Sequence, residues 1–268
     1  MIQNNDKNVI KIGTVNFQNN KVNRNGGLRE DGINTSKLVA EHIEKENYDI
    51  LGTQELTRNF LNNITSGLVH YKLYGGYRYG SNIISKKIPF INDFNENNNI
   101  VTKNVVIEEE TKLMPFIPNN FKDLKESIIK CSLMPRIVTI IVTKSDKGII
   151  CAINTHLDYQ IPSLQKRQLE FLKNIVKKYA SKYPVVLTGD FNMEIGTEHF
   201  DLFNNELKDI GLKRVEVNDK TNAYKFPNQT AIDHIFIPND WNVINKGVKN
   251  IDYVTDHKEV FVEVEKSK

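Results

Sequence analysis

The sequence predicts a mixed α/β protein on the basis of three observations. Short runs rich in β-branched residues recur from one end of the chain to the other, and turn residues bound them, as is typical of buried strands. Helical periodicity appears between some of these runs, but late in the chain strands follow one another with few helices. No GxGxxG or GxxxxGKS/T motif accompanies this pattern, which argues against a plain Rossmann or P-loop domain.

Each apolar run predicts one strand. In chain order these strands are Val9–Ile12, Ile50–Gly52, Ile83–Ile84, Val101–Ile107, Ile137–Val142, Ile149–Ile153, Val185–Leu187, Ile232–Ile237 and Val260–Val264. Two amphipathic helices are predicted over residues 35–47 and 164–179, because apolar side chains recur there on one helical stripe. Both helices lead into a strand.

We expect one domain over residues 1–268, with an irregular insertion around 91–135. A chain of 268 residues is long enough to bury a full core without a structural metal or disulfides. The stretch from Ile91 to Glu110 is rich in Asn and Glu, and Pro115 and Pro118 follow it. Residues of these types favour turns and loops, so this stretch is interpreted as irregular.

The charge balance excludes one class of function. The chain has 36 basic and 33 acidic residues, a net charge of +3, which is far from the excess of a protein that holds nucleic acid by charge alone. The two cysteines, Cys131 and Cys151, are expected to be buried and reduced. No signal peptide and no apolar stretch of about 20 residues is present, so we expect a cytoplasmic protein without a membrane span.

Polar side chains stand at the ends of several predicted strands, where a site residue would be aimed into a cleft. Singly they are weak indications, because strand-end Asn and Asp usually form turns and a lone His is usually structural; we interpret His42, His70, His199 and His234 as structural. Together they supply hard oxygen ligands and two imidazoles: Asn16, Glu55, His156, Asp190, Asn192, Asp233, Asp256 and His257. Such a set suits Mg²⁺ or Mn²⁺, and it leaves the imidazoles for phosphate contact or proton transfer.

Seven short motifs in these places carry a resemblance. In order they are Thr-Val-Asn-Phe-Gln at 14–18, Thr-Gln-Glu at 53–55, Asn-Ile-Ile-Ser at 82–85, Asn-Thr-His-Leu-Asp at 154–158, Gly-Asp-Phe-Asn at 189–192, Ile-Asp-His-Ile-Phe at 232–236 and Thr-Asp-His at 255–257. Their types and order resemble the endonuclease/exonuclease/phosphatase superfamily. The resemblance implies a deoxyribonuclease-I-like, four-layer α/β/β/α sandwich of two facing mixed β-sheets, and metal-assisted hydrolysis of a phosphoester.

The resemblance also implies a role for each residue. Glu55 would be the principal ligand of Mg²⁺ or Mn²⁺, helped by Asn16, and Asp256 would act on the metal or its waters. Asp190 would activate the attacking water, and the amide of Asn192 would hold that water or a phosphate oxygen.

Imidazoles and cations would bind the phosphate. His257 would stabilise the charge of the transition state, Asp233 would bond its far ring nitrogen, and His156 would grip the phosphate from the other side. Substrate binding is assigned to Asn82, Arg78 and Arg136, although a structural ion pair is an equal alternative for Arg136. Ala231 stands where the family often has a basic residue, whereas Val15 and Thr255 depart from its pattern without removing a catalytic group.

Two classes of substrate fit these residues. A phosphodiesterase acting on nucleic acid is slightly favoured, with a phosphatase or phosphodiesterase acting on a small molecule or a lipid head group as the alternative. Basic residues are scattered rather than gathered along a rim, and the aromatic residues of Tyr71–Tyr79 either stack on bases or pack in the core. A non-catalytic interaction module is disfavoured because the complete set of site residues is present. We expect a monomer with no protein partner.

Overall fold

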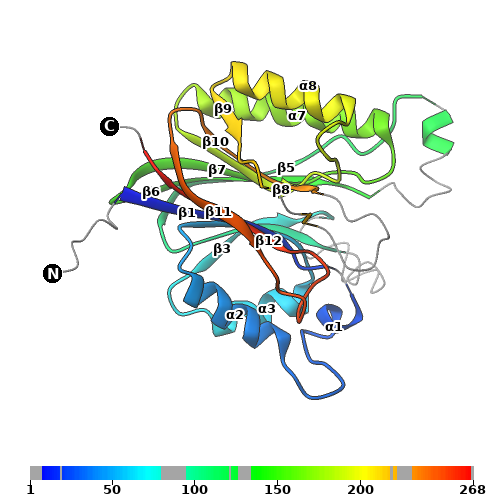
Figure 1. Ribbon diagram of the computed structural model, residues 1–268. Coiled ribbons are helices and arrows are strands. Elements are labelled where there is room, and N and C mark those ends of the chain that lie inside the picture. Colours follow the sequence, from blue (N-terminus) through cyan, green and yellow to red (C-terminus); the bar gives the residue numbers. More distant parts are fainter. Residues whose placement is uncertain are drawn as a thin grey trace.

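Two six-stranded mixed β-sheets lie face to face, and helices cover the outer face of each sheet (Figure 1). The computed structural model describes residues 8–18, 20–79, 95–120, 122–125, 134–217, 220–221 and 231–266. Within this part of the chain, the four layers follow the order helix, sheet, sheet, helix. The α/β/β/α sandwich that the sequence predicts is therefore confirmed.

The first sheet combines strands from both ends of the chain. Its strand order is β11-β12-β1-β2-β4-β3, and only β1 and β2 run parallel. The strands are β1 (Val9–Asn16), β2 (Ile50–Leu56), β3 (Lys72–Tyr77), β4 (Asn97–Thr102), β11 (Asn242–Lys249) and β12 (Glu259–Glu265). The helices on this side are α1 (Lys21–Arg24), α2 (Thr35–Glu46) and α3 (Arg58–Gly67).

The second sheet has the order β5-β6-β7-β8-β10-β9, and only β7 and β8 run parallel. Its strands are β5 (Val105–Leu113), β6 (Ile137–Ser145), β7 (Gly148–His156), β8 (Val185–Asp190), β9 (Leu212–Arg214) and β10 (Asp233–Pro238). Helices α7 (Pro162–Ala180) and α8 (Glu198–Asp209) cover its outer face (Figure 1).

Alternation along the strands separates three apolar layers. In β8, Val186 points into the layer between the sheets, while Val185 and Leu187 point into the layer beneath α7 and α8. The third layer lies between the first sheet and α2 and α3, and it contains Ile43 and Phe60. Because each sheet is buried on both faces, its central strands read as continuous apolar runs, and these runs are what made them predictable from sequence.

The prediction of an irregular segment over 91–135 is wrong for residues 97–113. Strands β4 and β5 occupy this stretch, one in each sheet, and the strand predicted over Val101–Ile107 is interrupted by a turn at residues 103–104. Burial of Asn98 in β4 is compensated by a partner across the sandwich: its Nδ2 donates to the carbonyl oxygen of Ile137 at 2.9 Å. The predicted strand Ile83–Ile84 lies outside the described residues.

Cys151 is buried in the layer beneath α7, as expected of a reduced thiol, and Cys131 lies outside the described residues. Among the described residues, no helix is long and apolar enough to cross a membrane.

The two parallel pairs place the predicted site at one edge of the sandwich. Asn16 and Glu55 come at the carboxyl ends of β1 and β2, while His156 and Asp190 come at those of β7 and β8. Strand β10 runs antiparallel to β8, so Asp233 at its start stands directly opposite Asp190 at the end of β8. Residues from five strands therefore converge where the two sheets meet.

Candidate active site

Glu55 is aimed into the site by an irregular backbone. The pairing of β2 with β4 shifts register between Thr53 and Leu56, and Glu55 itself has a φ of 59°, in the left-handed region. Asn192, just after β8, has a φ of 53°. Such conformations cost a non-glycine residue about 1–3 kcal/mol and concentrate at functional sites, because a regular strand would point these side chains elsewhere.

Asn16 joins the two sheets at the site. Its amide nitrogen Nδ2 donates to Glu55 Oε1 at 3.0 Å and to Asp190 Oδ2 at 2.9 Å. Its Oδ1 accepts from the backbone N–H of Gln18 at 2.8 Å, and this bond fixes which end of the amide faces the carboxylates. The amide nitrogen, not the oxygen, therefore faces the two carboxylates.

His257 is paired with a carboxylate. Its Nδ1 donates to Asp233 Oδ2 at 3.0 Å, and its Nε2 lies 3.9 Å from Asp190 Oδ2. Burial opposes the imidazolium charge, but Asp233 outweighs burial and raises the pKa of His257 to about 10. The ring is therefore a cation at neutral pH. Thr221 Oγ1 holds Asp233 in turn, donating to the same Oδ2 at 2.7 Å.

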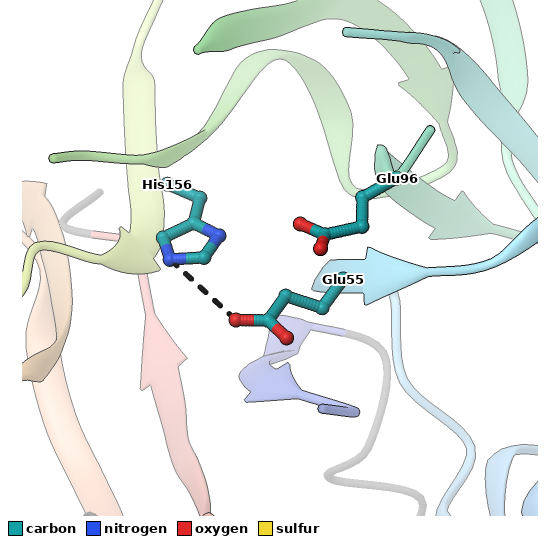
Figure 2. Close-up of side chains that lie close together, drawn as sticks. All are labelled: Glu55, Glu96 and His156. Carbon is teal, nitrogen blue, oxygen red and sulfur yellow. Dashed lines mark ion pairs between the residues drawn. The ribbon is translucent and has the colours of Figure 1, made fainter. Parts of the chain in front are cut away.

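His156 has the opposite environment. Its Nδ1 receives a hydrogen bond from Arg136 at 2.9 Å, and a guanidinium can only donate. Burial, together with the charges of Arg136 and Arg78, holds the pKa of His156 well below its usual value of 6.5. The ring is therefore neutral and carries its one proton on Nε2, which lies 3.7 Å from Asp190 Oδ2 and 3.8 Å from Glu55 Oε1 (Figure 2).

Asp190 is buried between the two imidazoles and is only 1 % exposed. Burial and the neighbouring Asp233 carboxylate raise the pKa of Asp190, while His257 and the bond from Asn16 oppose the rise. The backbone N–H of Asn192 donates to the other oxygen, Oδ1, at 2.9 Å. A carboxylate with a raised pKa is a stronger base than an exposed one, which suits it to take a proton from water.

The close approach of β8 to β7 depends on a glycine. Gly189 precedes Asp190, and a Cβ at this position would lie 2.4 Å from the backbone oxygen of Thr155. Any side chain here would push apart the strand ends that carry His156 and Asp190.

A pocket of about 220 Å³ opens on these groups. It is lined by Glu55, Arg78, Glu96, Met134, Arg136, His156, Tyr159, Asp190, Asn192 and His257. Arg78 forms an ion pair with Glu96, and burial, reinforced by Arg136, lowers the pKa of Arg78 to about 9, so that it stays charged at neutral pH. The pocket thus contains both carboxylates and cations.

The donor set fits a divalent cation. Glu55, Glu96 and His156 bring ligand atoms within 4.8 Å of one another (Figure 2). His156 presents a proton rather than a lone pair, which leaves the two carboxylates as hard oxygen donors of the kind that Mg²⁺ and Mn²⁺ prefer. Glu55 and Asp190 also accept from one amide nitrogen of Asn16, so their mutual repulsion would be offset by a cation. A second group, Asp190, Asp233 and His257, contains the imidazole–carboxylate pair described above.

The sequence profile of the Endonuclease/Exonuclease/phosphatase family matches residues 15–257. The chain belongs to this family. The superfamily resemblance that the sequence predicted is therefore confirmed. No curated protein sequence matches the chain.

Solved structures of the family share the fold. A family protein from Bacteroides thetaiotaomicron is 20 % identical, with a TM-score of 0.74 over 97 % of this chain and 98 % of that one. A mannosyl-6-phosphatase from B. thetaiotaomicron is 19 % identical, with a TM-score of 0.71 over 95 % and 99 %. TDP2 from C. elegans is 15 % identical, with a TM-score of 0.64 over 96 % and 75 %. At these identities the likeness concerns the fold alone.

Most predicted site residues of this family member come together. The pocket contains Glu55, Arg78, Arg136, His156, Asp190, Asn192 and His257. Asp256 lies beside it and accepts from Gln18 Nε2 at 2.8 Å, whereas Asn82 lies outside the described residues. The amide of Asn192 donates to the carbonyl oxygen of Leu157 at 3.0 Å.

Sequence reasoning missed Glu96 and Thr221. Glu96 stands just before β4, in the Asn-rich stretch that was interpreted as irregular, so its place beside Glu55 followed only from the pairing of β2 with β4. Thr221 is separated from Asp233 by twelve positions, and no local motif marks their contact. The departure at Thr255 is harmless: its hydroxyl donates to the carbonyl oxygen of Asn16 at 2.6 Å, as a serine could.

Proposed function

We propose that the protein is a divalent-metal-dependent hydrolase of phosphoester bonds, with Asp190 as the general base and His257 as the stabiliser of the transition state. One observation carries the proposal: a buried carboxylate with a raised pKa stands between a charged and a neutral imidazole, both of which direct Nε2 toward it. Family membership supports the reaction class.

Asp190, His257 and His156 each have a separate role in the proposed reaction. Asp190 accepts a proton from water as the water oxygen bonds to phosphorus and the bond from phosphorus to the leaving oxygen breaks. His257, as a fixed cation, donates from Nε2 to a non-bridging phosphate oxygen whose charge grows in the transition state. His156 donates from Nε2 to another such oxygen without changing its own protonation. Phosphoester hydrolysis needs little covalent chemistry from the protein, so positioning and fixed charge supply most of the rate.

Glu55 would hold Mg²⁺ or Mn²⁺, with Glu96 near enough to contribute, and Asn16 and Asp256 are the further candidates from sequence. When bound, the cation would neutralise phosphate charge as a Lewis acid. Whether or not its oxygen binds the cation, Asn16 would hold the Glu55 and Asp190 carboxylates in place through the hydrogen bonds that its amide nitrogen donates.

Three of the four tyrosines in the stretch Tyr71–Tyr79, which could have stacked on nucleic-acid bases, have contacts elsewhere. Tyr71 is buried and its hydroxyl donates to the carbonyl oxygen of Tyr48 at 2.9 Å, Tyr74 packs against the layer between the sheets, and Tyr77 lies against the Arg58 guanidinium. This favours the second substrate class, a small phosphoester, over a nucleic acid held by base stacking.

A substrate panel with Mg²⁺ or Mn²⁺ tests the proposal. It would contain single- and double-stranded DNA, RNA, sugar and inositol phosphates and a generic diester. We expect turnover that EDTA abolishes and excess metal restores, that Asp190→Asn abolishes, and that the exposed control Asp209→Asn leaves unchanged. Full activity after chelation would contradict the metal-dependent mechanism.

A further inference from the structure

Two buried guanidinium groups form one wall of the pocket and have no catalytic task in the mechanism above. Arg78 and Arg136 are each only 6 % exposed, and both line the pocket beside His156. Arg78 is paired with Glu96, whereas Arg136 donates to the neutral ring of His156. The pocket wall therefore carries two fixed positive charges on nearly buried side chains, and one of these charges is paired with Glu96.

Each of these side chains also has an unused donor. Among the described residues, the buried Nε–H groups of Arg78 and Arg136 have no hydrogen-bond partner. An unsatisfied buried donor costs about 1–3 kcal/mol, and more when the group is charged, so such groups are normally paired. Planar guanidinium forks match the oxygens of phosphate, which can accept two parallel bonds from one fork. Because Arg78 and Arg136 both line the pocket, a phosphate group there is their natural complement.

On the basis of the proposed function, we propose that Arg78 and Arg136 select a terminal phosphate, so that the substrate is a phosphomonoester of a small polar molecule. A monoester phosphate offers three non-bridging oxygens and a charge of about −1.5 to −2 at neutral pH. A diester phosphate offers only two such oxygens and a single charge. Two guanidiniums, His156 Nε2–H and the His257 cation supply more hydrogen-bond donors than the two non-bridging oxygens of a diester can use.

The size of the pocket agrees with this assignment. A volume of about 220 Å³ is below the roughly 300–1,000 Å³ that is usual for drug-sized ligands. It suffices for a phosphate and part of a small leaving group. Tyr159, at 48 % exposed, forms part of the lining and offers an aromatic face to that leaving group.

Equilibrium binding tests the selection separately from turnover. The catalytically impaired Asp190→Asn protein, loaded with Mg²⁺, would be titrated by calorimetry at pH 8 with inorganic phosphate and with dimethyl phosphate, a diester. We expect phosphate to bind at least about tenfold more tightly, as befits one or more extra charge-assisted hydrogen bonds. Adding Arg78→Gln should weaken phosphate binding by about tenfold or more and change dimethyl phosphate binding by less than about threefold.

Matched controls keep the test decisive. Arg214→Gln removes a half-buried guanidinium from β9, away from the pocket lining, and should leave both affinities unchanged. If Arg78→Gln unfolds, Arg78→Lys keeps the charge but loses the planar fork, and it should still reduce the preference for phosphate. Equal affinities for the two ligands, or a preference that survives both Arg78 variants, would overturn the selection.

Failure of the selection differs from failure of the proposed function. A protein that prefers phosphate through Arg78 but hydrolyses no ester would keep the selection and contradict the proposed function. A protein that hydrolyses diesters with Asp190 dependence, but shows no preference for inorganic phosphate, would keep the proposed function and overturn the selection.

Discussion

The two sides of the active site hold the same side chain in opposite states. On the side of β10 and the loop before β12, His257 donates from Nδ1 to a carboxylate and is a cation. On the side of β6 and β7, His156 accepts at Nδ1 from a guanidinium and is neutral. Both rings are largely buried, and both place Nε2 within 4 Å of Asp190 Oδ2.

The difference shows that the partner of Nδ1, rather than burial, determines the charge of each ring. Burial lowers the pKa of both histidines, and at His257 the Asp233 carboxylate is the largest influence that reverses that effect. Each ring nevertheless directs an N–H toward the site. A phosphate there would meet one charged and one neutral donor, while Asp190 between them stays available as the base.

The largest effect is expected from the residue that both rings face. Asp190→Asn removes the base but keeps the size and most hydrogen bonds of the side chain, so we expect the rate to fall by about a thousandfold or more. Steady-state kinetics with the best substrate of the panel measures this loss, and the thermal unfolding midpoint shows whether the fold is intact. A loss below about tenfold would assign the base to another group.

The next effect comes from removing the carboxylate beside His257. Asp233→Asn should lower the pKa of His257, because it removes the carboxylate that opposes the effect of burial most strongly. At pH 7.5 the ring would be mostly neutral, and we expect a loss of about a hundredfold. As the pH falls toward 6, the ring regains its proton, so the ratio of variant to wild-type rates should rise. A ratio that is independent of pH would show that Asp233 does not act through the charge of His257.

A smaller effect is expected on the other side of the site. Arg136→Gln removes the cationic donor from His156 Nδ1, so the ring can move its proton to Nδ1 and lose the N–H that faces Asp190. We expect about a tenfold loss of rate, partly restored in Arg136→Lys. The ¹⁵N chemical shifts of His156 report which nitrogen carries the proton. An unchanged tautomer in Arg136→Gln would restrict Arg136 to contact with substrate.

The smallest effect on activity is expected from a third buried ring outside the site. His234 bonds the carbonyl oxygen of Met193 and stacks on Phe200, and burial lowers its pKa to about 4. The folded state thus disfavours protonation of His234. Its contribution to folding stability is fully present above the unfolded pKa of about 6.5 and is lost as the pH falls toward 4. The loss amounts to about 3 kcal/mol of the free energy of unfolding.

Urea unfolding between pH 7.5 and 4 measures this pH-dependent loss in the free energy of unfolding. His234→Gln should be less sensitive to acid than the wild type while keeping near-normal activity at pH 7.5, and His199→Gln serves as the control on the same side of the sandwich. An unaltered slope of stability against pH in His234→Gln would contradict the buried neutral state.

Sequence predicted the edge at which the site forms, because the strands are apolar runs and the motifs mark their ends. Asn16, Glu55, His156 and Asp190 end four strands, and parallel pairing brings such ends together. The family resemblance also implied that Asp233 bonds the ring of His257 and favours its charged form, and the structure contains that bond. Sequence could not predict the neutral state of His156, because its partner Arg136 is 20 positions away and belongs to no shared motif. The contact of Thr221 with Asp233, 12 positions away, was likewise not predictable.

The asparagines of β4 led to the wrong prediction of an irregular segment, and the reason is physical. Asn favours turns when its amide bonds its own backbone. In Asn97–Thr102 two of the amides instead bond backbone oxygens of other strands, Ile137 of β6 and Tyr74 of β3, and the stretch is a buried strand. The same misinterpretation hid Glu96, which comes just before that strand and pairs with Arg78. Local propensity could not indicate either contact.

The most direct test of the account is the protonation of the two site histidines in one sample. Correlation spectra of the imidazole nitrogens and their protons, recorded with Mg²⁺ at pH 7.5 and assigned with His156→Gln and His257→Gln, report each ring separately. The account predicts protons on both nitrogens of His257 and on Nε2 alone of His156. Two rings with the same protonation state, or titrating together near pH 6.5, would contradict it.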